Sequence, residues 1–354
     1  MTTSRFDRVH DSYSGKTALV TGGFGFKGTW LALSLRMLGA RVVIAGHKNP
    51  DRDLSETLDF AALGIDAHEL DVRSNEFSSL VAETAPDFLF HLAAQPIVLE
   101  GYRNPVDTFS SNIMGTVNVL EAVRNLEGPV SVVNVTTDKV YRDVEKTEGY
   151  VETDELRGLD PYSSSKSCSE LVTFSYRTSF FAGSNKTVST CRAGNVLGGG
   201  DYSANRIIPD IVRALADDSL VGIRNFISVR PYEHVLDALY AYIVLAADQA
   251  ATPELAGEYN IGPNDDCLMA TGEIVRYAEA NFGLKVEDKS DPNAPHETAV
   301  LTLDSSLFRK TFHWAPKYDS KERILSETFD WYNLVKTNDT TAVTIEQVRS
   351  YLND

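Results

Sequence analysis

The sequence predicts an α/β protein in which a doubly wound parallel sheet is joined to a smaller C-terminal lobe. Two observations lead to this fold class. In the first half of the 354-residue chain, short runs rich in β-branched residues alternate with helical patterns, which is typical of a parallel sheet covered by helices. After Ala193 this alternation decays into short elements separated by loops, including the glycine-rich stretch at residues 198–201.

The expected elements follow one another in βα order along the first half of the chain. Strands are expected at Lys16–Gly22, Ala40–Ala45, Ala67–Asp71, Asp87–Leu92, Val130–Val135 and Val188–Arg192. Helices are expected at Thr29–Leu38, Glu76–Thr84, Pro105–Asn125 and Ser163–Phe181, and a later helix at His234–Gln249 is expected to return to the sheet.

Composition and charge exclude several classes of function. The net charge is −17, from 33 basic and 50 acidic residues, so the surface repels nucleic acid and anionic lipid. No apolar run is long enough to span a bilayer and the N-terminus has no signal-peptide core, so we expect a cytoplasmic protein without a membrane partner. Three scattered cysteines, Cys168, Cys191 and Cys267, predict neither disulfides nor a metal site.

A glycine-rich turn lies between the first strand and the first helix. Gly22, Gly25 and Gly28 have the spacing that allows a tight turn, close approach of backbone to a pyrophosphate, and close packing of helix on strand. This position predicts a dinucleotide on a Rossmann-type sheet. The second strand ends in Gly46-His47-Lys48-Asn49 without the acid that would bind the ribose of NAD, so NAD is expected but NADP stays open.

Two further groups of residues can carry acid–base chemistry. Tyr162 and Lys166 are four residues apart on one helix face, where the ammonium favours the phenolate form of the tyrosine. Such pairs also occur on solvated helices. Asp138 and Lys139 follow a predicted strand at the sheet edge where ligands bind, and together supply one acid and one base. A salt-bridged surface turn is the alternative explanation.

Together these motifs resemble the extended short-chain dehydrogenase/reductase superfamily, and nearly the whole chain resembles its CDP-glucose 4,6-dehydratase branch. The most specific mark is the Asp138-Lys139 pair after Thr137, since thymidine-linked dehydratases look like Asp-Glu there and 4-epimerases lack the pair. The other similar stretches are Gly25-Phe26-Lys27-Gly28, His91 to Pro96, Asn112 to Val117, Asp160 to Ser163, Arg192 to Val196, Gly198 to Asp201, Arg206 to Asp210, Arg224-Asn225, Arg230-Pro231, His234 to Leu236 and Pro295 to Glu297.

The resemblance implies a role for each matched position. Tyr162, with Lys166 and Thr137, would take the 4-hydroxyl proton of a hexose while hydride leaves C4. Lys139 would act as base at C5 and Asp138 as acid toward the 6-hydroxyl, before the hydride returns to C6. The residues implied at the cofactor are Gly22, Gly25, Phe26, Lys27, Gly28, His47, Asp71 (on the adenine), Val72, Ala93, Gln95, Asn112, Tyr162 and Lys166. Those implied at the nucleotide-sugar are Gln95, Asn195, Arg206, Arg224, Arg230 and His296.

The chain departs from this branch near the expected substrate. The tryptophan-rich loop of the family is here residues 142–150 without tryptophan, Phe226 replaces a proline, and Tyr232-Glu233 replaces Trp-Gln. A dehydratase for another nucleotide-sugar therefore remains an alternative. So do a nucleotide-sugar 4-epimerase and a non-catalytic NAD(P)-binding protein.

The resemblance also suggests how the chain is organised. Residues 1–192 and 234–252 are expected to form the dinucleotide-binding domain, and residues 193–233 and 253–354 the nucleotide-sugar-binding lobe. The helices Pro105–Asn125 and Ser163–Phe181 resemble those that form four-helix dimer interfaces in relatives, so a homodimer is expected.

Overall fold

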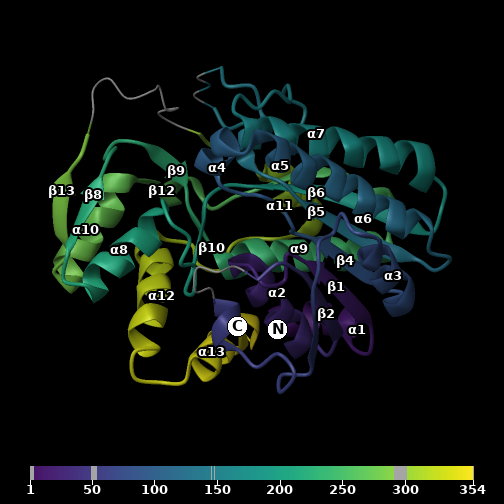
Figure 1. Cartoon of the computed structure of the whole chain (residues 1–354), viewed down its shortest axis with the longest axis horizontal. Coiled ribbons are helices and arrows are strands. Elements are labelled where there is room, and N and C mark those ends of the chain that lie inside the picture. Colours follow the sequence, from purple (N-terminus) through teal and green to yellow (C-terminus); the bar gives the residue numbers. More distant parts are fainter. Residues whose placement is uncertain (1–3, 49–53, 145, 147, 291–300, 354) are drawn as a thin grey trace.

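The main body of the molecule is a seven-stranded, fully parallel sheet (Figure 1). The computed structural model describes residues 4–48, 54–144, 146, 148–290 and 301–353, and the following account concerns these residues. The strands in spatial order are β11 (Glu258–Ile261), β6 (Lys186–Ala193), β5 (Val130–Val135), β4 (Phe88–His91), β1 (Thr17–Thr21), β2 (Arg41–Gly46) and β3 (Ile65–Glu69). The expected doubly wound sheet is confirmed.

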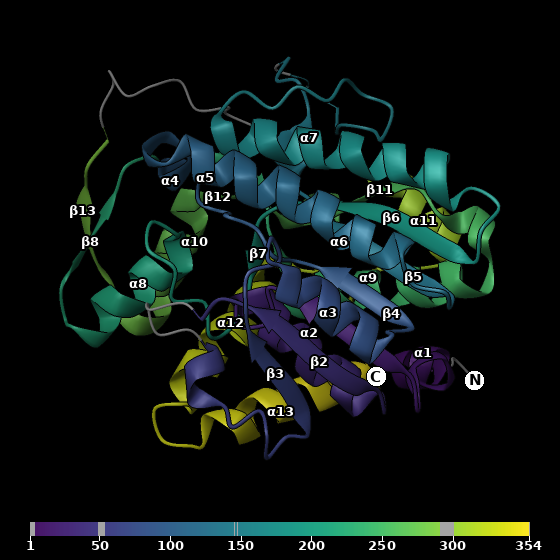
Figure 2. The same ribbon diagram turned by 45° about the vertical axis from the view of Figure 1, so that its right-hand side comes forward.

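Helices cover both faces of the sheet (Figure 2). The strand residues alternate between these two faces. On β2, Val42 and Ile44 pack in the core that contains α2 (Phe26–Met37) and α9 (Val235–Ala251). Val43 and Ala45 pack in a second core on the opposite face. That face carries α3 (Asn75–Thr84), α6 (Gly115–Arg124) and α7 (Pro161–Tyr176). Period-two burial on both faces is why these strands lack a polar side.

The helix predicted at Pro105–Asn125 contains a π-helical turn. It is built from α5 (Pro105–Phe109), the π segment η2 (Ser110–Met114) and α6. Within η2, Asn112 turns its side chain toward the sheet edge, where its Oδ1 accepts from the Gln95 backbone N–H at 2.8 Å. A π turn inside a helix often marks a functional region, and here it directs one polar side chain at the loop after β4.

The smaller lobe lies beside the carboxyl ends of the strands. Its elements are α8 (Ile207–Ala216), β8 (Leu220–Ile223), β9 (Val229–Pro231), β12 (Leu268–Ala270), α10 (Thr271–Phe282) and β13 (Lys285–Asp288). β8 pairs with β13 in parallel, and β9 pairs with β12 antiparallel. β7 (Val196–Leu197) and β10 (Glu233–His234) form a short parallel pair where the chain enters and leaves this lobe.

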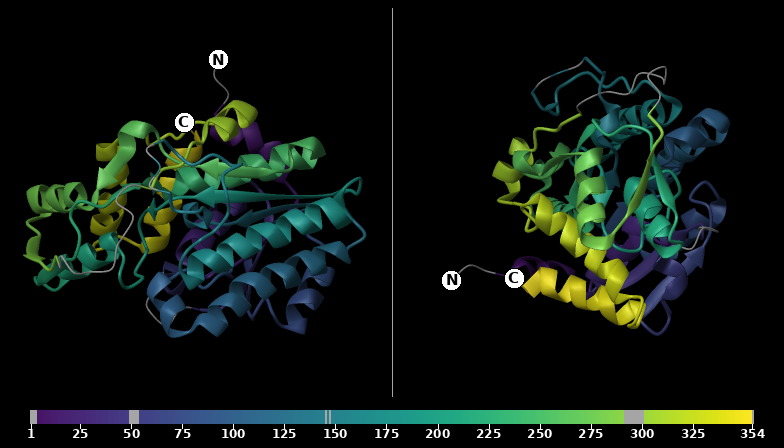
Figure 3. Two further views of the ribbon diagram at one scale, coloured as in Figure 1. Left: turned by 90° about the horizontal axis from the view of Figure 1, so that it is seen from above. Right: turned by 90° about the vertical axis from the view of Figure 1, so that its left-hand side faces the viewer.

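Two segments assigned to the smaller lobe by the sequence lie on the main body instead. β11 is the edge strand of the large sheet, paired with β6. The last helix, α13 (Thr340–Asn353), packs against α1 (Arg5–Tyr13) and α2, and Figure 3 shows α1 and α13 side by side. The predicted boundary at residue 253 therefore misplaces β11 and α13, because both are recruited by long-range contacts.

The remaining helices and turns connect these layers. They are α4 (Val98–Arg103), α11 (Ser306–Phe312), α12 (Lys321–Leu334), the π segment η4 (Arg177–Phe181), and the short 3₁₀ turns η1 (Leu54–Thr57), η3 (Asp138–Val140), η5 (Pro253–Leu255) and η6 (Asp265–Cys267). Within the described parts of the chain, no helix combines the length and the apolar character needed to cross a membrane.

Candidate active site

A large cleft separates the carboxyl edge of the sheet from the smaller lobe. Its volume is about 1880 Å³, enough for a dinucleotide and a second large ligand. The cleft is lined by most of the residues singled out in the sequence: Gly22, Gly25, Phe26, Lys27, Gly28, His47, Asp71, Val72, Ala93, Gln95, Thr137, Lys139, Tyr162, Lys166, Asn195, Arg206, Arg224 and Arg230. Asp138 and Asn112 are buried next to it, and His296 lies outside the described residues.

The glycine turn has the geometry of an anion-binding loop. A Cβ on Gly28 would lie 2.1 Å from the carbonyl oxygen of Gly22, and one on Gly22 would lie 2.7 Å from the Ala93 nitrogen. Gly25 is the N-cap of α2 and makes no side-chain cap, so the first turn of the helix presents its N–H groups to the cleft. Such a helix N-terminus favours a pyrophosphate.

The carboxylate of Asp71, which follows β3, is held in place by two basic side chains. Arg73 contacts both oxygens of Asp71, the shortest distance being 2.6 Å, and His47 Nε2 lies 3.3 Å from Asp71 Oδ2. The hydrogen bonds from Arg73 lower the pKa of Asp71 to about 2. Lys48 in turn lies 3.4 Å from Glu69 Oε2. Both basic residues after β2 therefore have acidic partners.

Tyr162 and Lys166 lie on the first two turns of α7, both buried at the cleft wall. Asp160 caps this helix, and its Oδ1 accepts from the N–H groups of Tyr162 and Ser163 at 2.9 and 3.1 Å. Lys166 Nζ donates to the Val135 carbonyl at 3.0 Å, and burial lowers the pKa of Lys166 to about 8. The helix and the end of β5 thus fix the relative positions of this pair.

The expectation that Lys166 lowers the pKa of the phenol is wrong for the protein without ligands. Burial raises the pKa of Tyr162 to about 12, while a hydrogen bond with Thr137 opposes this rise. Desolvation disfavours the phenolate more than the surrounding groups stabilise it. The resting tyrosine is therefore the neutral phenol.

The η3 turn and its N-cap residue, Thr137, hold the other three predicted catalytic side chains. Asp138 is fully buried, and its Oδ1 accepts from the Thr137 hydroxyl at 2.9 Å and from Lys139 Nζ at 3.0 Å. Lys139 also donates to Asn195 Oδ1 at 3.3 Å. Thr137 therefore lies between Tyr162 and Asp138, and one hydrogen-bonded chain joins all four side chains.

The predicted substrate arginines lie on the smaller-lobe side of the cleft. Arg206 Nη1 is 3.1 Å from Asp201 Oδ2, and Arg230 is buried with Nη1 donating to the Val229 carbonyl at 2.8 Å. Arg224 is exposed at the lining. Phe226 and Tyr232, two of the positions where the sequence departs from the resembling family, line the same wall.

Sequence reasoning placed Lys27 at the cofactor but missed a buried carboxylate behind the glycine turn, Glu233. Lys27 donates to the Tyr242 hydroxyl at 2.7 Å, and burial lowers its pKa to about 8. Glu233 on β10 is buried, and among the described residues neither of its carboxylate oxygens has a hydrogen-bond partner. Burial raises the pKa of Glu233, while the Lys27 ammonium opposes that rise. The replacement of Gln by Glu at position 233 was visible in the sequence, but its burial was not.

Comparison with known proteins relates most of the chain to nucleotide-sugar dehydratases. Residues 19–327 match the family model described as GDP-mannose 4,6 dehydratase. The CDP-glucose 4,6-dehydratase of Salmonella typhimurium is 37% identical to this chain over 322 residues, covering 88% of this chain and 89% of that protein.

Two solved structures share the fold. The UDP-glucuronic acid 4-epimerase of Bacillus cereus, in complex with UDP-glucuronic acid and NAD, has a TM-score of 0.77 and 20% identity, with 90% of this chain and 99% of that chain covered. The dTDP-glucose 4,6-dehydratase of Bacillus anthracis, in complex with NAD, has a TM-score of 0.76 and 23% identity, with 90% and 97% covered.

Proposed function

The chain belongs to the GDP-mannose 4,6-dehydratase family, and from this premise we propose that it is an NAD-dependent nucleotide-sugar 4,6-dehydratase with CDP-glucose as substrate. The products are CDP-4-keto-6-deoxyglucose and water. One observation carries the proposal beyond the family: Asp138 and Lys139 form an ion pair at the cleft and are linked to Tyr162 through Thr137. A 4-epimerase has no use for this additional acid and base.

The residues around the glycine turn fit a dinucleotide. Gly25 and Gly28 leave backbone N–H groups of α2 open to a pyrophosphate. When bound, the nicotinamide accepts hydride from C4 of the sugar and later returns it to C6. NAD is favoured over NADP because His47 and Lys48, the basic residues available for a 2′-phosphate, are already paired with Asp71 and Glu69.

The oxidation half of the reaction depends on Tyr162. As a phenolate it takes the proton of the 4-hydroxyl. Thr137 hydrogen-bonds to Tyr162, and Lys166, one helical turn further along α7, donates to the Val135 carbonyl. The ketone formed at C4 then acidifies the proton at C5.

The elimination half depends on the ion pair of the η3 turn. Transfer of one proton over the 3.0 Å from Lys139 Nζ to Asp138 Oδ1 converts the pair into a neutral amine and a carboxylic acid. Lys139 then removes the C5 proton, and Asp138 protonates the departing 6-hydroxyl to release water.

Substrate binding is assigned to the smaller lobe. Asn195, Arg206, Arg224 and Arg230 line the part of the cleft beyond η3, where the positive charges of the three arginines suit a nucleoside diphosphate. In a chain with net charge −17, such a local group of arginines is needed to hold an anion. The sheet domain thus binds the dinucleotide, and the smaller lobe binds the nucleotide-sugar.

A homodimer is proposed from the outer surface of the helical layer. Val106, Met114, Leu171, Phe174 and Phe180 are exposed along α5, η2, α7 and η4. An apolar stripe of this kind commonly marks a protein interface, and size-exclusion chromatography with light scattering should report twice the 39.0 kDa chain mass.

The function is tested by mass spectrometry of nucleotide-hexoses incubated with the protein and NAD. CDP-glucose should lose one water, and the product should absorb ultraviolet light in alkali as 4-keto-6-deoxy sugars do. UDP-glucose, dTDP-glucose and GDP-mannose serve as competitors, and Tyr162→Phe as the inactive control. Formation of CDP-galactose without loss of water would instead establish a 4-epimerase.

A further inference from the structure

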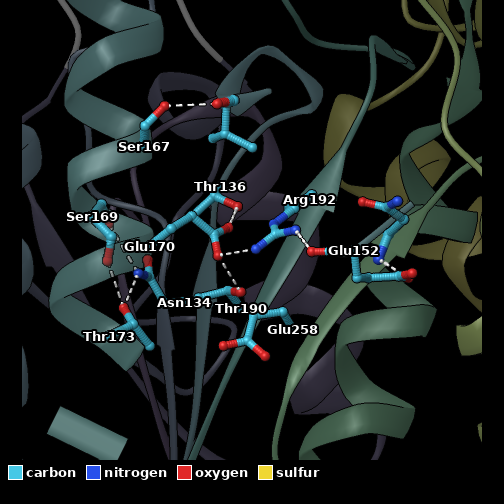
Figure 4. A network of polar contacts seen from close by, with 12 residues as sticks. Asn134, Thr136, Glu152, Ser167, Ser169, Glu170, Thr173, Thr190, Arg192 and Glu258 are labelled. Carbon is cyan, nitrogen blue, oxygen red and sulfur yellow. Dashed lines mark hydrogen bonds and ion pairs between the residues drawn. The ribbon is translucent and has the colours of Figure 1, made fainter. Parts of the chain in front are cut away.

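A buried ion pair lies next to the η3 turn (Figure 4). Glu170 of α7 and Arg192 of β6 are both buried, with 2.9 Å between Oε2 and Nη2. Removing two charges from water is costly, and their attraction offsets that cost only when other hydrogen bonds also satisfy them. The Thr190 hydroxyl donates to the same carboxylate at 2.7 Å, and Arg192 Nη1 donates to the Glu152 carbonyl at 2.8 Å.

Both ends of the η3 turn are hydrogen-bonded to this pair. Thr136, two residues before the turn, donates its hydroxyl to Glu170. Tyr141, immediately after the turn, accepts a hydrogen bond from Arg192 Nη1 at 2.8 Å. Glu170 therefore holds one end of the segment that carries Asp138 and Lys139, and Arg192 holds the other end.

The same pair connects the turn to the helix of Tyr162. Tyr162, Lys166 and Glu170 are spaced four residues apart on α7, so they follow one face of the helix. Glu170 reaches Thr136 from that face, and Lys166 reaches the preceding residue, Val135, at 3.0 Å. The positions of Asp138 and Lys139 relative to Tyr162 are thus set through Glu170 and Arg192.

We propose that the Glu170–Arg192 pair is a positioning device for the elimination step, which fixes the η3 turn against the helix that carries Tyr162. This inference rests on the proposed function. Apolar side chains of similar volume would commonly stabilise a core equally well. The hydrogen bonds to both ends of the turn therefore indicate that the ion pair positions the turn. Misplacement of a reacting group by about 1 Å can cost about 10²-fold in rate.

The test cuts the two links and leaves the ion pair intact. In the double variant Thr136→Val/Tyr141→Phe, NAD binding and oxidation at C4 should remain close to those of the parent protein. Elimination should slow by roughly 10–100-fold, so that enzyme-bound reduced nicotinamide accumulates in single turnovers with CDP-glucose. The single variant Thr136→Ser keeps the hydroxyl, so its ratio of oxidation to elimination should equal that of the parent protein.

Ser189→Ala is the matched control, because Ser189 is also buried on β6 and bonds to Gln249 and the Gly257 N–H but not to the turn. It should change thermal stability without changing the ratio of oxidation to elimination. Hydrogen exchange of residues 137–141, measured on the same proteins without substrate, should accelerate in the double variant only.

An unchanged ratio and unchanged exchange in the double variant would overturn the positioning role, as would an equal slowing of both steps. Failure of the parent protein to release water from any nucleotide-hexose would instead refute the proposed function, and with it this inference.

Discussion

At the scale of single residues, burial decides what the predicted chemical groups can do. The spacing of Tyr162 and Lys166 was correctly identified as one face of a helix, but the sign of the tyrosine pKa shift was not. The spacing describes only the neighbouring ammonium, whereas the larger effect is removal of the phenol from water. Likewise, Asp138-Lys139 could be singled out by type, while the full burial of the aspartate came from packing around η3.

Lys139→Ala separates the two halves of the proposed reaction. Removing the C5 base should leave NAD binding and oxidation at C4 largely intact, while overall turnover falls about 10²–10⁴-fold, the usual contribution of a general acid–base group. Stopped-flow absorbance of the nicotinamide should then show reduced cofactor accumulating on the enzyme. Tyr162→Phe should show no such signal, because the ketone cannot form. Near-parental turnover by Lys139→Ala would make the pair a structural salt bridge.

Gly28→Ala should abolish most dinucleotide binding. The new Cβ would lie 2.1 Å from the Gly22 carbonyl oxygen, so the turn before α2 must move. Calorimetric titration with NAD should show the affinity falling at least tenfold. Gly128→Ala, where a Cβ meets no atom within 4 Å, is the matched substitution and should bind NAD as the parent does. If the parent, Gly28→Ala and Gly128→Ala bound NAD with equal affinity, the pyrophosphate would have to bind elsewhere.

At the scale of elements, the sequence predicts the buried strands best. β5 has the predicted bounds, Val130–Val135, because four valines define it and all six of its residues are buried. β3 lies earlier than predicted, at Ile65–Glu69, since this edge strand buries only its first residue and offers no clear alternation. The π turns η2 and η4 were not predicted. Where a helix forms a π turn depends on contacts with distant residues, such as the hydrogen bond between Asn112 of η2 and Gln95 in the loop after β4.

Asp160→Ala tests how far the α7 cap supports Tyr162. Asp160 accepts from two N–H groups in the first turn, one of them belonging to Tyr162. Loss of such an N-cap typically costs about 0.5–2 kcal/mol, which urea unfolding should detect, and the looser first turn should also lower turnover. Asp160→Asn keeps an acceptor at the same place and should recover most of both losses. A variant with lower stability but parental turnover would show that Tyr162 is held by other contacts.

At the scale of the whole molecule, pairing between distant segments determines the features that local sequence patterns did not predict. β11 and α13 were assigned to the smaller lobe by chain order, yet their partners, β6 and α1, lie in the main body. The Glu170–Arg192 pair was missed for the same reason, although Glu170 continues the four-residue spacing of Tyr162 and Lys166. Most of the residues that the family resemblance implied at the site line the cleft, and several of them follow the ends of strands that local patterns reveal.

Acid stability of the whole protein should depend on two buried histidines. Burial lowers the pKa values of His91 and His234 to about 3, against 6.5 for an exposed imidazole. Below pH 6.5 the unfolded chain binds protons that the folded protein cannot, so the free energy of unfolding decreases as pH falls. At pH 5 each histidine should account for a loss of about 2 kcal/mol. Glu233 acts in the opposite sense, because its raised pKa favours the folded state as pH falls.

His234→Asn isolates one of these contributions. His234 Nδ1 accepts from the Leu236 N–H at the start of α9, and an asparagine oxygen can take that bond. The variant loses the ring contact with Tyr318 and should be less stable than the parent at pH 7. Because asparagine does not titrate, urea unfolding at pH 7 and pH 5 should show a difference between the two proteins that shrinks by about 2 kcal/mol in acid. A difference that stays constant between the two pH values would mean that His234 is protonated in the folded protein, and that α9 begins at a charged rather than a neutral imidazole.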